Sequence, residues 1–240
     1  MRSTSARALL VAVVALVLSG CSVEHRVTGP FPWQPQPPVA DSPTNAIRRF
    51  EWGWNRRDLG RLENLLTDDF RFVFALGDSA GNVFRDDPFG REELLVCLRN
   101  LFTGGGSAPP ATSIQLVLDP TLRALPDSRP GKHPVWHKEI VTSVDLAIVT
   151  ADGAEYRIMG NARFFVVRGD SALIPQGSGL EPDSTRWFIQ QWNDETLSGA
   201  GSVGPKRAVP PDLLVPQPTH NTTWGQVLAL YYRVRGASRR

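Results

Sequence analysis

The chain has 240 residues, of which 41% are hydrophobic and 21% charged, a composition typical of a globular protein and not of a disordered one. Its two cysteines exclude a disulfide-rich scaffold and a multi-cysteine zinc site. Two of the 26 basic residues, Arg2 and Arg7, lie in the first 20 residues, so the remainder is formally neutral. A neutral protein has no electrostatic footprint for nucleic acid, and we expect no nucleic-acid partner.

The first 21 residues have the pattern of an export signal. Arg2 and Arg7 precede an apolar run, 8–18, that is too short for an ordinary membrane span. The run ends in Leu18-Ser19-Gly20-Cys21, which resembles the lipobox of bacterial lipoproteins. The resemblance implies that residues 1–20 are removed as a signal peptide and that Cys21 becomes an acylated first residue. The alternative is a plain secretory signal cut near Gly20.

Acylation of Cys21 would make a lipid bilayer the first expected partner, because several acyl chains on one residue suffice for stable anchoring. Ser22 is not the aspartate associated with retention in the inner membrane. We therefore expect a lipid-anchored protein of the bacterial cell envelope, in the outer membrane and facing the periplasm. Cys97 would then be the only free thiol, and its apolar surroundings in the sequence predict a core residue.

Residues 21–42 form a proline-rich segment between the anchor and the domain. Such a segment cannot form a helix and favours an extended polyproline conformation of about 3 Å per residue. We interpret it as a spacer, with a ligand for a proline-binding partner as the alternative. Its prolines are Pro30, Pro32, Pro35, Pro37 and Pro38.

Three helices are expected early in the folded part. Ser42 or Thr44 can cap a helix that ends near Arg57, with apolar residues at the three-four spacing. A short helix is expected over 59–66. A third is expected over 90–102, where Gly104-Gly105-Gly106 stops it.

Strands are expected between and after these helices. Phe70, Phe72 and Phe74 alternate as in a half-buried strand over 69–74, and residues 83–85 are a candidate returning strand. Asp152-Gly153 signals a hairpin. Four longer strand-like runs follow, at 111–119, 135–150, 154–167 and 185–195.

This order of elements predicts an α+β fold in which three helices pack against one antiparallel sheet. The stretches 54–58 and 65–70 (Trp-Asn-Arg-Arg-Asp and Leu-Leu-Thr-Asp-Asp-Phe) resemble the opening of the nuclear transport factor 2-like superfamily, which includes SnoaL-like cyclases and ketosteroid isomerases. The run 187–194, Trp-Phe-Ile-Gln-Gln-Trp-Asn-Asp, resembles its last strand. The resemblance covers residues 43–195. It implies a cone-shaped, strongly curved antiparallel sheet closed by three N-terminal helices, with a pocket at the open end and frequent dimers.

Residues 196–240 form a proline- and glycine-rich extension with a short helix expected near 222–234. Trp224, Val227, Leu228 and Tyr231 would share one face of this helix. We expect it to pack back onto the domain; a helix lying on a membrane surface is the alternative.

The alternation of side chains along the strands predicts which residues face the interior. Burying an unpaired charge is costly, so the apolar set of each strand should face the helices. The polar groups that remain on the pocket side belong to Tyr156, Trp54 and either Gln190 or Gln191, and Trp192 is expected beside them. A β-bulge would reverse the facing of the residues near it. The outer face would carry His137, Glu139, Arg157, Met159, Arg163 and Phe165 and is a candidate homodimer surface.

No motif identifies a catalytic site. The related isomerases carry a carboxylate base on the first strand, where this chain has Phe72-Val73-Phe74, and Asp194 or His137 are the only stand-ins. His133 and His137 lack a third ligand, so we expect no metal. No phosphate-binding loop, nucleophile elbow or dinucleotide fingerprint is present, and we expect no cofactor.

Three functional hypotheses remain open. The first is a membrane-tethered domain that binds a small apolar ligand or a protein partner without catalysis. The second is a SnoaL-like isomerase, dehydratase or hydrolase that acts on a hydrophobic substrate, with Asp194 or His137 as general base. The third is a structural role through a homodimer of the outer sheet face.

Overall fold

The structure is a computed structural model that describes residues 36–78, 84, 87–169, 183–197 and 219–232. The expected export signal over residues 1–20, Cys21 and most of the proline-rich segment lie outside these residues, as does most of the strand expected at 83–85. Residues Pro37–Arg240 form one unit, separate from Met1–Gln36. Among the described residues no helix has the length and hydropathy needed to cross a bilayer.

The described residues contain four helices: α2 (Pro43–Arg56), α3 (Leu59–Glu63), α4 (Arg91–Thr103) and α5 (Trp224–Tyr232). The hydroxyl of Ser42 accepts the backbone N–H of Asn45 at 3.1 Å, and Pro43 occupies the first turn, where no donor is needed. Arg57 ends α2 in the left-handed conformation, with a φ of 53°. Cys97 of α4 is buried in the core, and burial raises the pKa of its thiol.

The described strands form one sheet. Its main order is β1-β6-β5-β4-β2; β3 pairs with β4, and β7 pairs with β5. The strands are β1 (Leu66–Val73), β2 (Ala111–Leu118), β3 (Leu125–Pro126), β4 (His137–Thr150), β5 (Glu155–Gly169), β6 (Asp183–Thr196) and β7 (Thr219–Thr222).

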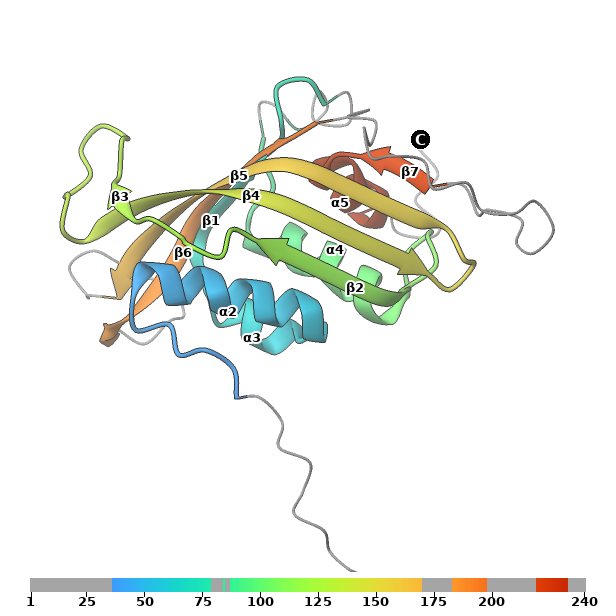
Figure 1. Ribbon diagram of the computed structural model, residues 1–240, viewed down its shortest axis with the longest axis horizontal. Coiled ribbons are helices and arrows are strands. Elements are labelled where there is room, and N and C mark those ends of the chain that lie inside the picture. Colours follow the sequence, from blue (N-terminus) through green and yellow to red (C-terminus); the bar gives the residue numbers. More distant parts are fainter. Residues whose placement is uncertain (1–35, 79–83, 85–86, 170–182, 198–218, 233–240) are drawn as a thin grey trace, which may run out of the picture. The chain divides into compact units, whose positions relative to one another are not determined.

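The α+β fold class predicted from the sequence is confirmed: a curved sheet lies over the helices α2, α3 and α4 (Figure 1). The expectation of a purely antiparallel sheet is wrong at two places, because β1 runs parallel to β6 and β7 runs parallel to β5. Both pairs join segments that are far apart in the sequence, where no hairpin turn imposes an antiparallel partner. The sheet is therefore mixed, and β7 and α5 extend the folded part beyond residue 195.

Side chains alternate along β4 and β5, and the apolar residues that the sequence predicts to face inward do so. Each inward residue packs in the core and keeps at most 3% of its surface exposed. These residues are Ile140, Val144, Leu146 and Ile148 of β4, and Ile158, Ala162, Phe164 and Val166 of β5.

Side chains of α2 form hydrogen bonds with the outer edge of β2. Asn55 accepts the N–H of Leu116 at 2.6 Å and donates to the carbonyl of the same residue at 2.9 Å. Glu51 accepts the N–H of Leu118 at 3.0 Å, and Arg48 donates to the carbonyl of Asp119. Helix side chains thus take the place of a neighbouring strand at this edge.

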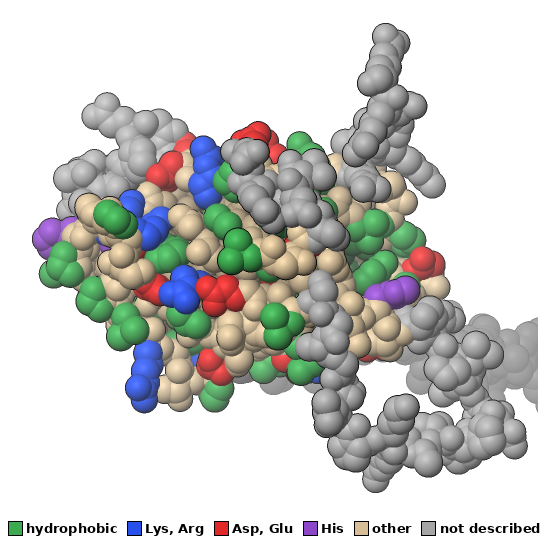
Figure 2. Space-filling model, turned by 90° about the horizontal axis from the view of Figure 1, so that it is seen from above, with side chains coloured by type: hydrophobic (Ala, Val, Ile, Leu, Met, Phe, Trp, Pro, Cys, Tyr) green, Lys and Arg blue, Asp and Glu red, His purple; other side chains and the backbone are tan. Residues whose placement is uncertain are grey.

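The outer face of the sheet is only in part the open surface that we expected for a homodimer. Phe165 is 3% exposed, because the guanidinium of Arg129 lies over its ring, 4.1 Å from the centroid. Arg157 pairs with Asp145, and Met159 remains 39% exposed. Basic and acidic side chains lie side by side on the face that Figure 2 presents. Phe165 is therefore not available to a second copy.

Candidate functional site

Aromatic rings fill the core between the sheet and the helices. Trp54 of α2 and Trp192 of β6, both expected to line a pocket, have no exposed surface. Trp224 of α5 contacts both, with ring centroids 5.1 Å from Trp54 and 4.3 Å from Trp192. Both contacts are edge to face, which is a favourable arrangement of aromatic rings. A side chain of α5 therefore occupies the place that the sequence assigns to a ligand.

A cleft of about 670 Å³ lies beside the last residues of β1 and β6, a volume typical of small-molecule sites. Leu76 and Leu197 are 91% and 60% exposed, so its walls include exposed apolar surface. The described residues that line it are Val73, Phe74, Ala75, Leu76, Gly77, Asn193, Asp194, Glu195, Thr196, Leu197 and Thr223.

Asp194 is the buried acid of this cleft, with 3% of its surface exposed. Its Oδ1 accepts the backbone N–H of Thr196 at 3.0 Å and the hydroxyl of the same residue at 2.5 Å. Its Oδ2 accepts the N–H of Gly225 at 2.7 Å. Burial raises the pKa of Asp194 to about 6, against the effect of these hydrogen bonds, and the charge of Asp78 raises it further.

A second buried acid, Asp78, lies beside the same glycine. A Cβ added to Gly225 would lie 2.8 Å from Oδ2 of Asp78 and 2.6 Å from Cδ1 of Phe74. The same Oδ2 accepts the hydroxyl of Thr223 at 2.5 Å. Two carboxylates thus converge on the beginning of α5, where the helix N–H groups carry partial positive charge. They attach α5 to the end of β6 and to the chain that follows β1.

The hydrogen bonds of Asp194 decide what it can do chemically. A general base must reach the proton that it removes from a substrate. Both oxygens of Asp194 are engaged by donors of this chain, one by Thr196 and one by Gly225. Its raised pKa is the property that it shares with catalytic carboxylates.

His137, the other catalytic candidate, lies in a different part of the molecule. It pairs with Val167 in the sheet, whereas Asp194 pairs with Ala162. Its Nδ1 accepts the N–H of His133 at 3.3 Å. Burial lowers the pKa of His137, and the charge of Lys132 lowers it further. The two candidates therefore do not form one catalytic pair.

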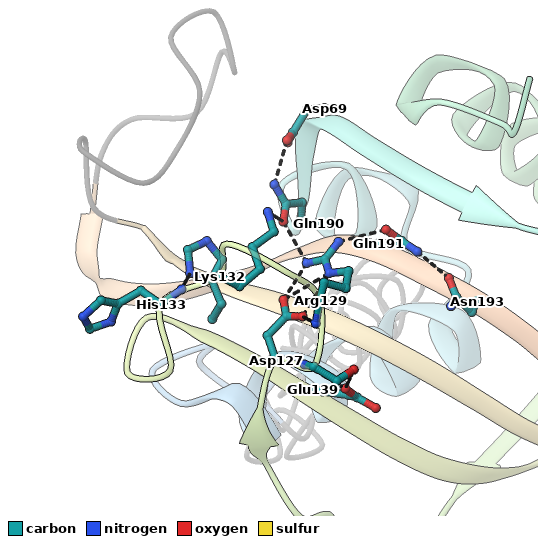
Figure 3. Close-up of polar contacts among 11 residues, drawn as sticks. Asp69, Asp127, Arg129, Lys132, His133, Glu139, Gln190, Gln191 and Asn193 are labelled. Carbon is teal, nitrogen blue, oxygen red and sulfur yellow. Dashed lines mark hydrogen bonds and ion pairs between the residues drawn. The ribbon is translucent and has the colours of Figure 1, made fainter.

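Next to His137, the outer face carries a polar network centred on Arg129 (Figure 3). The guanidinium of Arg129 binds Asp127 through Nε–Oδ1 and Nη2–Oδ2 contacts of 3.0 and 2.7 Å. The side chain of Asp127 has no exposed surface. Burial alone would raise the pKa of Asp127, but the hydrogen bonds and charge of Arg129 hold it below its ordinary value. Arg129 also donates to Gln191 at 2.8 Å and to Gln190 at 3.0 Å.

Gln190, expected on the pocket side, belongs to this outer network instead. Its amide donates to Oδ2 of Asp69 at 2.7 Å, and its oxygen accepts from Lys132 at 3.1 Å. The register between β5 and β6 shifts at Phe165, which is the local irregularity that reverses the facing of a strand residue. The network holds the segment before β4 against the sheet.

Tyr156, the last of the expected pocket residues, lies beside β7. Its ring stacks on that of His220, with centroids 5.4 Å apart, and burial raises the pKa of its hydroxyl. The expected pocket residues therefore lie in three places: Trp54 and Trp192 in the core, Gln190 on the outer face, and Tyr156 at β7. In the described part of the chain no group of three His, Cys, Asp or Glu is arranged to hold a metal ion.

Sequence reasoning missed Asp78, Thr223 and Arg129. Thr223 has a recognisable signal, since its hydroxyl accepts the N–H of Gln226 at 3.0 Å, as residues before a helix commonly do. Asp127 accepts the N–H of Arg129 at 2.9 Å, which is a common turn pattern, but a turn does not indicate which face it covers.

No protein-family model matches the sequence, and no curated protein matches it. The structure is similar to a nuclear transport factor 2-like protein of unknown function in nutrient uptake from Rhodospirillum rubrum. The two chains are 16% identical, the match covers 65% of this chain and 99% of that chain, and the TM-score is 0.41. A nuclear transport factor 2-like superfamily protein from Salmonella enterica shares 14% identity over 69% of this chain and 94% of its own, with a TM-score of 0.43. A putative scytalone dehydratase from Novosphingobium aromaticivorans shares 10% identity over 64% of this chain and 80% of its own, with a TM-score of 0.42.

Proposed function

We propose that this protein is a lipid-anchored protein of the bacterial envelope whose domain binds a small apolar molecule in the cleft, without catalysing a reaction. The observation that carries the binding part is a cleft of about 670 Å³ with exposed leucines in its wall and a buried acid whose oxygens are engaged by the chain itself.

The shape of the cleft favours a small molecule over a protein partner. A concave site with apolar walls and few polar groups suits a small ligand, whereas a stable protein interface requires a broader surface. Leu76 and Leu197 supply apolar surface that a ligand would cover. Asp194 supports the wall by holding Thr196 and Gly225.

Binding can be tested with the apolar dye N-phenyl-1-naphthylamine, whose fluorescence rises when it leaves water. Leu197→Asp should weaken dye binding at least tenfold, since it places a charge in the apolar wall. Leu125→Asp is the matched control, because Leu125 of β3 is also 60% exposed but lies outside the cleft. Equal dye binding by both variants would contradict the proposed site.

The anchor is supported by the apolar run 8–18 and by the lipobox-like sequence that ends at Cys21. Bacteria that express the chain can be fed an alkyne-labelled palmitate. We expect label on the wild-type protein and on Cys97→Ala, and none on Cys21→Ala. Label that persists on Cys21→Ala would contradict acylation at this residue.

The raised pKa of Asp194 supports a second candidate function, an isomerase, dehydratase or hydrolase of hydrophobic substrates with Asp194 as general base. This function predicts turnover of such substrates by the wild-type protein and its loss in Asp194→Asn. The binding function predicts no turnover in either protein, so the two candidates give different results in one assay.

A further inference from the structure

Arg56 and Arg61 lie beside Trp52 on the helical side of the domain, and the charges of Arg61 and Arg186 act on Arg49. We call this surface the basic face; it comprises Arg49 and Arg56 of α2, Arg61 of α3 and Arg186 of β6. The guanidinium carbons of Arg56 and Arg61 lie 6.0 and 5.4 Å from the ring centroid of Trp52. Burial lowers the pKa of Arg49, the charges of Arg61 and Arg186 lower it further, and the charge of Asp58 opposes this effect.

The basic face carries a surplus of positive charge. Arg61 pairs with Asp58 at 3.1 Å, and Arg186 pairs with Asp183 at 2.9 Å. Neither Arg49 nor Arg56 forms an ion pair with a carboxylate within the described residues. Two of the four arginines therefore have no ion-pair partner in the described part of the chain, and an anion bound at this surface would offset their charge.

Arginines on the outer face of the sheet are paired with carboxylates. There Arg157 pairs with Asp145, and Arg163 pairs with both Glu139 and Glu195. The charges of opposite sign that lie side by side in Figure 2 belong to this face. Arg157 and Arg163 are thus compensated, unlike Arg49 and Arg56.

The chain enters the domain beside the basic face. The carbonyl of Pro38 accepts from Nη1 of Arg49 at 3.1 Å, and the carbonyl of Ala40 accepts the N–H of Trp187, the residue after Arg186, at 2.7 Å. Only the residues between Cys21 and Pro37 separate this entry point from the proposed anchor. In an extended polyproline conformation of about 3 Å per residue, they keep the basic face within about 50 Å of the bilayer.

We propose that the basic face docks onto an anionic phospholipid surface, with the guanidinium groups on lipid phosphates and Trp52 at the level of the headgroups. This inference rests on the proposed anchor, which brings the domain to a membrane. Arginine binds phosphate through charge-assisted hydrogen bonds, and tryptophan is enriched where protein meets the membrane interface. Each arginine near an anionic leaflet strengthens binding roughly fivefold.

Vesicle sedimentation tests the docking with the full chain carrying Cys21→Ala, so that no acyl group masks the electrostatic part. Vesicles of phosphatidylcholine alone are compared with vesicles of equal parts phosphatidylcholine and phosphatidylglycerol. The signal segment is the same in every variant and cancels in the comparison. We expect a preference for anionic vesicles that Arg56→Glu with Arg186→Glu lowers at least 30-fold, and that added salt also lowers.

The matched control is Arg99→Glu with Arg123→Glu, which changes the charge equally at two exposed arginines outside the basic face. Far-ultraviolet circular dichroism verifies that both double variants are folded. An equal loss in the control, or no preference for anionic vesicles, would overturn the proposal. The two proposals fail separately: without acylation the palmitate label is absent while the vesicle preference persists, and without docking the label persists while the preference is absent.

Discussion

The indole of Trp224 meets the indole of Trp192 edge to face, with ring centroids 4.3 Å apart and ring planes at 75°. Trp192 lies on β6, which is flanked by β1 and β5, and Trp224 lies on α5, the last described helix. The C-terminal end of α5 also contacts the domain, since the hydroxyl of Tyr231 donates to the carbonyl of Pro109 at 2.6 Å. The helix is therefore a part of the core.

We expect Trp224→Ala to lower the free energy of unfolding by about 3–5 kcal/mol, because it removes a fully buried ring and leaves a cavity. Urea denaturation followed by circular dichroism measures the change. Leu230→Ala, at a half-buried position of the same helix, should lower it much less. Similar losses in the two variants would show that α5 contributes through its helix and not through this ring.

Two glycines in helices should respond to alanine with opposite signs. Alanine favours a helix over glycine by about 1 kcal/mol. At Gly60 of α3 the added Cβ would meet only Asp58, at 3.8 Å, so Gly60→Ala should stabilise the protein. At Gly225 the Cβ would lie 2.6 Å from Phe74, so Gly225→Ala should destabilise it by about 1–3 kcal/mol. A stabilising Gly225→Ala in thermal unfolding would contradict the close approach.

Asp194 should make the protein more stable as the pH falls from about 7 to about 4. Its pKa is about 6 in the folded protein, above the ordinary value of 3.8, so the folded state binds a proton before the unfolded state does. This contribution is absent above pH 6 and grows to about 3 kcal/mol below pH 3.8. The measurement is the unfolding free energy of wild type minus that of Asp194→Asn across this range.

The measurement compares wild type with Asp194→Asn because the stability contributions of other acids change with pH in the opposite direction to that of Asp194. Asp127 and Glu139 have lowered pKa values, so their contributions are lost as the pH falls. They are present in both proteins and cancel. A difference that stays constant, or falls, between about pH 7 and about pH 4 would show that the pKa of Asp194 is not raised.

Removing Arg129 should be costly because it leaves a buried charge without a partner. The side chain of Asp127 has no exposed surface, and we expect Arg129→Met to lower the free energy of unfolding by about 3–5 kcal/mol. Adding Asp127→Asn to this variant should restore part of the loss. Arg157→Met is the control, since the side chains of Arg157 and Asp145 are 35% and 42% exposed and such pairs contribute about 1 kcal/mol or less.

The order of elements and the inward faces of the long strands could be predicted because they depend on local pattern. Ile140, Leu146 and Phe164 point inward, as the alternation of β4 and β5 requires. The first three helices were found from their caps, apolar spacing and stops, with errors of a few residues at the ends.

Features that depend on distant partners could not be predicted. Nothing near Leu66 indicates that its strand pairs parallel with Ile189, and the irregularity at Phe165 that accompanies the outward facing of Gln190 has no sequence signature. The apolar face of α5 predicts burial, but it does not indicate that Trp224 fills the space expected for a ligand.

The contacts of Asn55 and Glu51 with β2 have a consequence for crowded conditions. An uncovered outermost strand offers its amide and carbonyl groups to other chains and can seed fibrils. In this protein the groups of Leu116 and the N–H of Leu118 are already bonded to the helix. In a concentrated solution these groups would therefore not be available to pair with the strand of another copy.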